Sequence, residues 1–302
     1  MVSRRVAMAI MLAIATLGVP LGLSSNSTAA QEVTIDCPAP TVASPSPALQ
    51  PAAVTPAVTP APFPERGGEL TIFAAASLTD AFTAIAADLE AAQPGLAISA
   101  NFGGSQALVA QLAAGAEADL FASANEAQMD AASQNGSIAG EPVTFAHNDL
   151  TIVTPADNPA GIMSPADLGN DGLRLVLAQP EVPAGRYARA SLCAMEEEPA
   201  TYGEGFVARV AANIVSQEED VRAVLAKVQL GEADAGIVYR SDATAAGDAI
   251  QTIPIPAAVN IVAAYPIAMV SGGDEPLAAA FIAYLLGPEG QATLQEFGFA
   301  PA

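Results

Sequence analysis

Two serines, Ser77 and Ser105, stand where an apolar segment ends and an amphipathic segment begins. The apolar segments are typical of buried strands, and the residues that follow have helical spacing. Backbone N–H groups at the start of a helix have no partner inside the helix and carry a partial positive charge. A hydroxyl and such amides can bind an anion without lysine or arginine. The pattern favours an anion site, with a helix cap at each serine as the simpler alternative.

The sequence around the second serine, NFGGSQALVAQL, strengthens the ligand interpretation. Gly103 and Gly104 permit a close approach of the backbone to a bound molecule. The chain contains neither GxxxxGK[ST] nor GxGxxG, so these junctions differ from the phosphate loops of nucleotide enzymes. We therefore expect an anion site of another kind.

From Glu69 onward, strand-like and helix-like segments alternate. Strands are expected at 69–75, 96–102, 118–124, 148–155, 173–180, 233–243 (with its turn) and 263–270, and helices at 78–93, 105–115, 125–136, 185–195, 218–231 and, as a pair, 276–299. This alternation predicts an α/β fold with parallel sheets covered by helices. In such sheets ligands bind at the carboxyl ends of the strands, where both serines lie.

The composition excludes several classes of function. The chain has 302 residues with 32 acidic and 10 basic side chains, a net charge of −22. This charge repels nucleic acid and anionic membranes, and it also repels a small anion at long range. No GxSxG nucleophile motif is present, and the single histidine, His147, lies outside any catalytic pattern, so an enzyme is not expected. One histidine and two distant cysteines also argue against a cation site.

The N-terminal region is typical of an exported protein. A basic start, an apolar run at 6–23 and small residues up to Ala30 predict a secretory signal over residues 1–30. An uncleaved anchor remains an alternative, because the run is near the ~18-residue minimum for a membrane span. Residues 31–66, rich in Pro and Ala, predict an extended linker. In an exported chain Cys37 and Cys193 could form a disulfide, which the sequence leaves open.

Five segments in order resemble the periplasmic molybdate-binding proteins of ABC transporters, a family of solute-binding proteins. The segments are AAASLTDAF, NFGGSQALVAQLAAGAEADLFASAN, VPAGRYARASL, EEDVRAVLAKVQLGEADAGIVYRSDA and AAYPIAMV. The resemblance covers residues 69–302 and implies a two-lobed periplasmic binding protein fold. Each lobe would be a mostly parallel sheet flanked by helices, with the ligand cleft between the lobes. Lobe 1 would comprise 67–147 and 265–302, and lobe 2 would comprise 148–264.

The resemblance also implies a set of neutral groups that bind the oxyanion. These are the hydroxyls of Ser77, Ser105 and Tyr239 and the backbone amides of Ala184 and Val221. The residue patterns agree with this set, because Ala184 and Val221 each stand at the expected start of a helix. Tyr239 ends an apolar strand, where a phenol can point into a cleft.

Three arginines lie close in sequence to these positions, namely Arg186, Arg222 and Arg240. The family pattern uses no arginine at the anion. We expect Arg222 and Arg240 to pair with surface acids and Arg186 to face solvent.

The function implied by the resemblance is capture of molybdate, and of tungstate with it, for delivery to the membrane permease of an ABC importer. The protein would act as a monomer in the periplasm or at the outer face of the cytoplasmic membrane. It would need no cofactor and would not bind nucleic acid. The alternative is a binding protein for another tetrahedral oxyanion, such as sulfate.

Overall fold

The computed structural model describes residues 33–37, 63–64 and 67–302. The predicted signal at 1–30 and most of the predicted linker at 31–66 lie outside these residues. Within the described ranges, every helix is too short or too polar to cross a bilayer.

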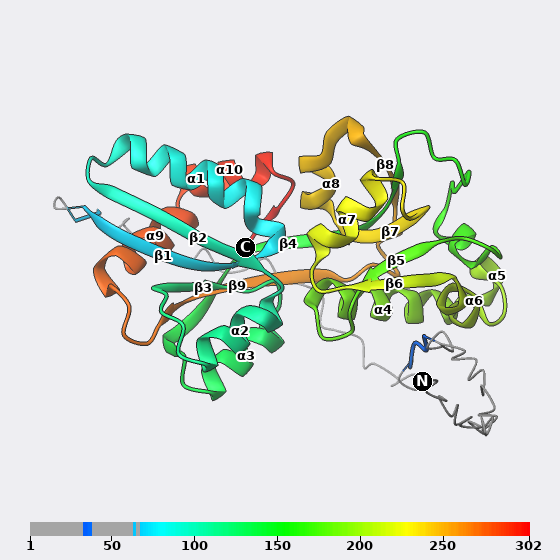
Figure 1. Ribbon diagram of the computed structural model, residues 1–302, viewed down its shortest axis with the longest axis horizontal. Coiled ribbons are helices and arrows are strands. Elements are labelled where there is room, and N and C mark those ends of the chain that lie inside the picture. Colours follow the sequence, from blue (N-terminus) through cyan, green and yellow to red (C-terminus); the bar gives the residue numbers. More distant parts are fainter. Residues whose placement is uncertain (1–32, 38–62, 65–66) are drawn as a thin grey trace, which may run out of the picture. The chain divides into compact units, whose positions relative to one another are not determined.

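Five strands form the first part of a ten-stranded sheet (Figure 1). They are β1 (Gly68–Ala75), β2 (Leu96–Gly103), β3 (Leu120–Ala122), β4 (Ile138–Pro155) and β9 (Val262–Val270). β1 pairs in parallel with β2 and β3, while β9 is antiparallel to both β3 and β4. The strand order in this part is therefore β2-β1-β3-β9-β4. The short C-terminal strand β10 (Ala300–Pro301) pairs with β4.

The long strand β4 continues into the second part of the sheet. Its residues up to Asp149 pair with β9, and its residues from Leu150 onward pair with β7. The remaining strands are β5 (Leu175–Ala178), β6 (Ile214–Glu218), β7 (Ala235–Tyr239) and β8 (Ile250–Pro254). β5 pairs in parallel with β6 and β7, and β8 is antiparallel to β4.

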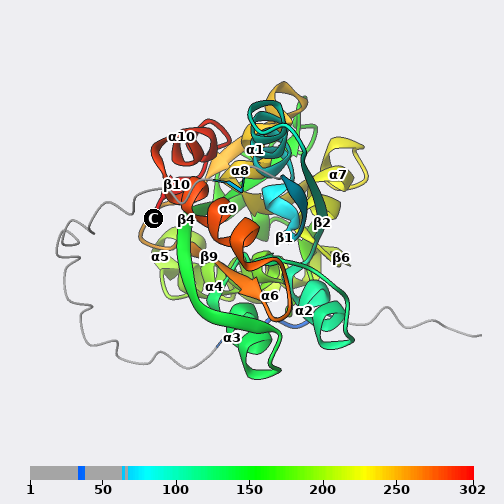
Figure 2. The same ribbon diagram turned by 90° about the vertical axis from the view of Figure 1, so that its left-hand side faces the viewer.

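Helices cover both faces of the first part of the sheet (Figures 1 and 2). On one face lie α1 (Thr79–Ala92), α9 (Glu275–Leu286) and α10 (Pro288–Glu296). On the other face lie α2 (Ser105–Ala113) and α3 (Glu126–Gln134). Strands covered on both faces must be apolar along their whole length, which explains the buried run at the end of β1.

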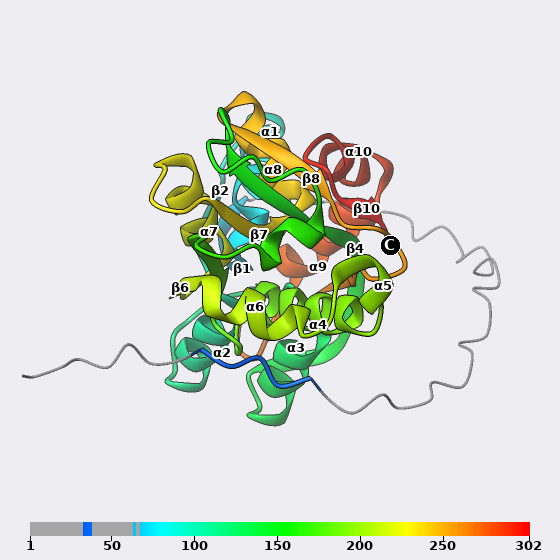
Figure 3. The ribbon, with the colours of Figure 1, turned by 90° about the vertical axis from the view of Figure 1, so that its right-hand side faces the viewer.

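The second part of the sheet is covered in the same way (Figure 3). α7 (Val221–Gln229) packs on one face, while α4 (Pro183–Glu196) and α6 (Phe206–Asn213) lie on the other. α5 (Pro199–Tyr202) precedes α6, and α8 (Arg240–Ala246) follows β7 and packs against β4. The α/β class is confirmed, with β4 and β9 as the antiparallel strands that connect two parallel sets.

Several elements were not expected from the sequence, among them the short elements α5, β8 and β10 and three longer ones with weak patterns. The first half of β4, residues 138–147, contains Gly140 and Pro142 and pairs with register shifts, so it lacks a clean strand pattern. β6 is a partly exposed edge strand, and the polar residues at its end interrupt the apolar pattern that would predict a strand. α6 has only 8 residues, too few for a clear helical period.

A disulfide joins Cys37 to Cys193 in α4, with a Cα–Cα distance of 5.5 Å. The sequence had left this pairing open. The segment before Cys37 packs against the body, since Ile35 is buried in the main hydrophobic core and Val33 is packed against that core. The N-terminal segment is therefore held both by a covalent bond and by apolar contacts.

Replacing both cysteines by serine should lower the free energy of unfolding by about 2–5 kcal/mol, because the bond closes a loop with a sequence separation of 156 residues. Denaturant unfolding without ligand measures this loss. Anion affinity should stay the same, since neither cysteine lines the pocket described below. Equal unfolding midpoints for the two proteins would contradict the expected stabilisation.

Candidate functional site

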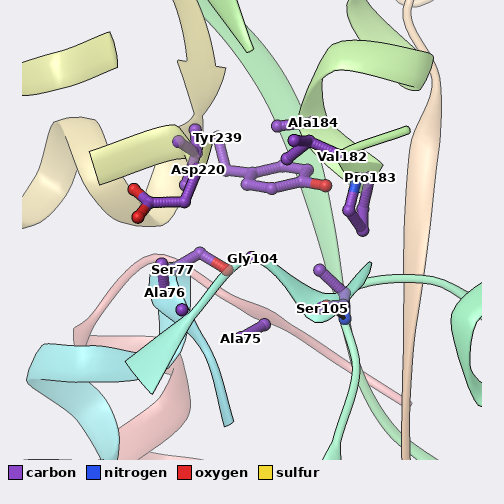
Figure 4. A pocket seen from close by; sticks show the side chains of 13 residues that line it. Ala75, Ala76, Ser77, Gly104, Ser105, Val182, Pro183, Ala184, Asp220 and Tyr239 are labelled. Carbon is purple, nitrogen blue, oxygen red and sulfur yellow. Dashed lines mark hydrogen bonds between the residues drawn. The ribbon is translucent and has the colours of Figure 1, made fainter. Parts of the chain in front are cut away.

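The five predicted site residues line one pocket (Figure 4). Ser77, Ser105, Ala184, Val221 and Tyr239 follow or end strands β1, β2, β5, β6 and β7, all of which belong to the parallel sets. The carboxyl ends of these strands meet at the pocket, as expected for ligand sites in α/β sheets. The pocket is small: the space open to the centre of a water molecule is about 10 Å³. It therefore fits a small anion far better than a nucleotide or a sugar.

Ser77 does not cap a helix, so the alternative interpretation of this serine as a helix cap is wrong. It lies in the short 3-10 turn Ala76–Leu78, and Thr79 instead donates its hydroxyl to the Ala76 carbonyl oxygen at 2.7 Å. The Ser77 side chain is 4% exposed, and its Oγ lies 2.8 Å from the hydroxyl oxygen of Tyr265. The hydroxyl thus has one protein partner behind it and the pocket in front.

Ser105 is not a cap either, because Gly104 occupies the N-cap position of α2. The Ser105 Oγ accepts a hydrogen bond from the backbone N–H of Ala124 at 3.1 Å. Gly104 is required here, because a Cβ at this position would lie 2.6 Å from the carbonyl oxygen of Glu219. The close approach brings the start of α2 next to the loop before α7.

The amide of Ala184 is at the second position of α4, after Pro183. N–H groups in the first turn of a helix have no intrahelical acceptor, so this amide is available to a ligand. Gly185 follows because the turn is packed tightly, and a Cβ on it would lie 2.0 Å from the carbonyl oxygen of Gln179.

The amide of Val221 begins α7. The helix is capped by Asp220, whose carboxylate accepts from the N–H of Ala223 at 2.9 Å. This bond satisfies the Ala223 amide and leaves the Val221 amide at the pocket. The positive end of the helix favours an anion there.

Tyr239 is the last residue of β7 and is 1% exposed. Among the described residues its hydroxyl has no hydrogen-bond partner. Burial raises the pKa of this hydroxyl well above its ordinary value, so it keeps its proton. Figure 4 shows the ring extending across the pocket above Ser77 and Ser105. A buried hydroxyl without a partner costs about 1–3 kcal/mol, and a bound anion would remove this cost.

The three arginines lie outside the pocket lining. Arg222 pairs with Asp80 at 2.7 Å and Arg240 pairs with Asp149 at 3.3 Å, as expected. Arg186 is exposed, also as expected. Of the described residues that line the pocket, only Asp220 is charged, and its carboxylate accepts from the Ala223 amide, so the donors available to a ligand are neutral groups.

Catalysis by a histidine and binding of a metal cation find little support at this site. Nδ1 of His147 lies 2.9 Å from the carbonyl oxygen of Pro301, and this histidine is not part of the pocket lining. In the described part of the chain, no group of three or more His, Cys, Asp or Glu side chains is arranged to hold a metal ion. What the arrangement can do is surround a small acceptor with hydrogen-bond donors.

The sequence analysis missed the groups that lie behind the pocket. Tyr265 contacts Ser77 across 188 positions of sequence, and no local pattern predicts such a contact. Asp242 is fully buried beside Arg222, although in sequence it resembles an ordinary first-turn acid of α8.

The family model for bacterial extracellular solute-binding proteins matches residues 70–300. The chain belongs to this family.

Curated relatives define the similarity further. The molybdate-binding protein ModA of Mycobacterium tuberculosis is 40% identical over 256 residues, which cover 84% of this chain and 90% of that protein. The protein of the same name from Escherichia coli is 34% identical over 239 residues, 77% of this chain and 89% of that protein. A solved substrate-binding domain of a putative molybdenum ABC transporter from Clostridium difficile is 29% identical, with a TM-score of 0.58, and covers 78% of this chain and 99% of that chain. The two-lobed periplasmic binding protein fold implied by the resemblance is thus confirmed.

Proposed function

We propose that this protein binds molybdate, and tungstate with it, and delivers the anion to the permease of an ABC importer. The observation that carries the proposal is the convergence of three hydroxyls and two helix-start amides, from Ser77, Ser105, Tyr239, Ala184 and Val221, on one small pocket. The names of the curated relatives support molybdate as the ligand. The protein would act as an exported monomer without enzymatic activity.

Neutral donors are sufficient for tight binding. A hydrogen bond to a charged group contributes about 1.5–3 kcal/mol. Five such bonds give a gross ~8–15 kcal/mol, from which the cost of association and ordering is subtracted. The remainder is compatible with dissociation constants near the micromolar range, about −8 kcal/mol.

A pocket that only donates hydrogen bonds selects against protonated anions. Hydrogenphosphate carries an O–H that would face a donor and leave both groups without an acceptor. Molybdate, tungstate and sulfate are fully deprotonated at neutral pH, so charge and protonation do not separate them. Sulfate is smaller, and we expect it to contact fewer of the five donors at once. For this reason molybdate and tungstate are preferred over the sulfate alternative.

Molybdenum content after dialysis tests the proposal. The purified protein is dialysed to equilibrium against molybdate at a concentration well above micromolar, and molybdenum is measured on both sides of the dialysis membrane. About one molybdenum atom per chain is expected, and the Ser105→Ala variant should retain far less. Ser137→Ala, a half-buried serine directly before β4 and outside the pocket lining, is the matched control. Wild-type protein without bound molybdenum would refute the proposed ligand.

We propose further that the lobes comprise the residues expected from the sequence, 67–147 with 265–302 and 148–264, and that they close over the anion by a hinge. Contacts between elements of the two parts support a closed arrangement. Arg222 in α7 pairs with Asp80 in α1 at 2.7 Å, and Gln106 in α2 donates to the Glu219 carbonyl oxygen at 2.9 Å. Solution scattering should show a smaller radius of gyration with molybdate than without it.

Replacing Asp80 by Asn should weaken molybdate binding by up to about fivefold, mainly through faster release. The Asp80–Arg222 pair is partly exposed, with side-chain exposures of 38% and 30%, and such pairs contribute about 0–1 kcal/mol. In the Asp80→Asn variant the closed form lacks this ion pair, while the hydrogen-bond donors of the pocket are unchanged. Stopped-flow release kinetics measure the effect, and Asp88→Asn later in α1 is the control. An unchanged release rate would show that the Asp80–Arg222 ion pair does not stabilise the closed form.

Raising the concentration of sodium chloride should speed molybdate capture. The net charge of −22 repels a dianion, and salt screens this repulsion beyond about 10 Å at 0.1 M. We expect the association rate to rise about two- to fivefold between low and physiological ionic strength. The protein has 5 tyrosines and no tryptophan, so tyrosine fluorescence can report binding. A rate that falls with salt would mean that local positive potential at the pocket outweighs the net charge.

A further inference from the structure

A buried polar network lies directly behind Ser77. The hydroxyl of Tyr265 on β9 is 2.8 Å from the Ser77 Oγ. The side-chain amide of Asn148 on β4 donates to the Tyr265 oxygen at 3.4 Å and to the Ser241 Oγ at 2.8 Å. Tyr265 and Asn148 are both fully buried. Asn148 lies on β4 and Tyr265 lies on β9. These two strands are adjacent, and Tyr265 is opposite Ala146 in their pairing.

The bond from the Asn148 amide limits the directions that the other hydrogen bonds in this network can take. An amide N–H can only donate, so the Asn148 side chain occupies a lone pair of the Tyr265 oxygen. Of the two possible directions of the 2.8 Å contact between Tyr265 and Ser77, the one in which Tyr265 donates to the Ser77 Oγ uses the Tyr265 proton. Burial raises the pKa of the Tyr265 hydroxyl, which keeps this proton in place. In that direction an acceptor site of the Ser77 oxygen is occupied, and Ser77 has its own proton free to point into the pocket.

The second serine is arranged in the same way by a different group. The backbone N–H of Ala124 donates to the Ser105 Oγ at 3.1 Å, and a backbone amide cannot accept. In that direction each serine of the pocket receives a hydrogen bond from the protein and can give its proton to a ligand. For Ser105 the donor is part of the main chain, whereas for Ser77 it is a side chain that can be replaced.

We propose that Tyr265, held by Asn148, is a positioning residue that fixes Ser77 as a hydrogen-bond donor and makes the pocket specific for fully deprotonated oxyanions. The inference deepens the proposed function and rests on it. Tyr265 does not line the pocket, so it acts on the ligand only through Ser77.

A double-mutant cycle on molybdate affinity tests this inference. Tyr265→Phe removes the hydroxyl and keeps the ring that packs against Phe145 and Phe299. Alone, it should weaken molybdate binding about three- to tenfold, because the Ser77 hydroxyl is free to rotate. In a Ser77→Ala background the same change should alter affinity less than about twofold, since the residue through which it acts is gone. Tyr202→Phe, a buried tyrosine packed on Phe206, is the control for loss of a tyrosine hydroxyl.

Each outcome of the cycle supports or overturns the inference. Equal losses in both backgrounds would mean that Tyr265 acts on the pocket by packing alone. Tighter binding by Tyr265→Phe would mean the opposite direction, in which Ser77 gives its proton to Tyr265. No loss in Tyr265→Phe, with Ser77→Ala still impaired, would overturn the inference and leave the proposed function intact. Absence of molybdate binding by the wild-type protein would overturn both.

Thermal unfolding of each variant without ligand is measured in parallel. A positioning role predicts a coupling in affinity between Tyr265 and Ser77 whatever the change in stability. If Tyr265→Phe fails to fold, Asn148→Leu provides a second test of the same chain of hydrogen bonds. It removes the donor to Tyr265 from the adjacent strand and should also weaken binding only when Ser77 is present.

Discussion

Replacing Tyr239 by Phe should weaken molybdate binding by about 10- to 100-fold and leave the free protein at least as stable. A hydrogen bond to a charged ligand is worth about 1.5–3 kcal/mol, and the ring that packs on Tyr265 is kept. The hydroxyl has no partner within the described part of the chain, so its removal from the free protein breaks no hydrogen bond. Calorimetric titration gives the affinity, and thermal unfolding gives the stability.

This combination separates a ligand-binding hydroxyl from a structural one. Tyr284→Phe, in a half-buried position on α9, serves as the control and should change neither quantity. A Tyr239→Phe protein with wild-type affinity would show that the phenol does not touch the anion. A protein that loses stability and affinity together would instead assign the hydroxyl to a bond inside the free protein.

The second large effect concerns Asp242, which is fully buried in α8. Its carboxylate accepts from the backbone N–H of Tyr239 at 3.2 Å and lies 3.6 Å from the guanidinium of Arg222. Burial raises the pKa of Asp242 from 3.8 to about 7, against the opposing effect of Arg222. The folded protein therefore binds a proton more tightly than the unfolded chain. The stability from this proton is present below pH 3.8 and is lost as the pH rises to about 7.

Asp242→Asn should remove this pH dependence. The isosteric amide keeps an acceptor for the Tyr239 N–H, and Arg222 keeps its pair with Asp80. The difference in unfolding free energy between variant and wild type should shift in favour of the variant by a few kcal/mol between pH 4.5 and 7.5. Urea unfolding at several pH values measures this difference, and Asp248→Asn, an exposed acid, is the control. A difference that is constant with pH would mean that Asp242 stays ionised throughout.

Local patterns in the sequence were sufficient to predict the α/β class and the segments that meet at the pocket. Ser77 and Ser105 could be found because an apolar strand, small residues and a helical period occur in direct succession. The resemblance then added Tyr239, Ala184 and Val221, and the last two would contribute a backbone amide, which leaves no signature in residue type.

The errors have a common cause. A helix cap at each serine was the alternative interpretation because Ser is favoured at that position, yet Leu78 and Gly104 occupy the N-cap positions and the serine oxygens bond elsewhere. Their actual partners, Tyr265 and the Ala124 amide, are 188 and 19 positions away in sequence. Contacts of this kind depend on the packing of strands, which no single segment encodes.

The central claim is that neutral donors select a fully deprotonated tetrahedral oxyanion, and calorimetric titration of the purified protein with molybdate, tungstate, sulfate and phosphate tests it most directly. The account predicts one-to-one binding of molybdate and tungstate with much weaker heats for sulfate and phosphate. Tight binding of sulfate with weak binding of molybdate would support the pocket as an oxyanion site but would identify sulfate as its ligand. Binding of hydrogenphosphate as tight as that of molybdate would contradict a pocket built of donors only.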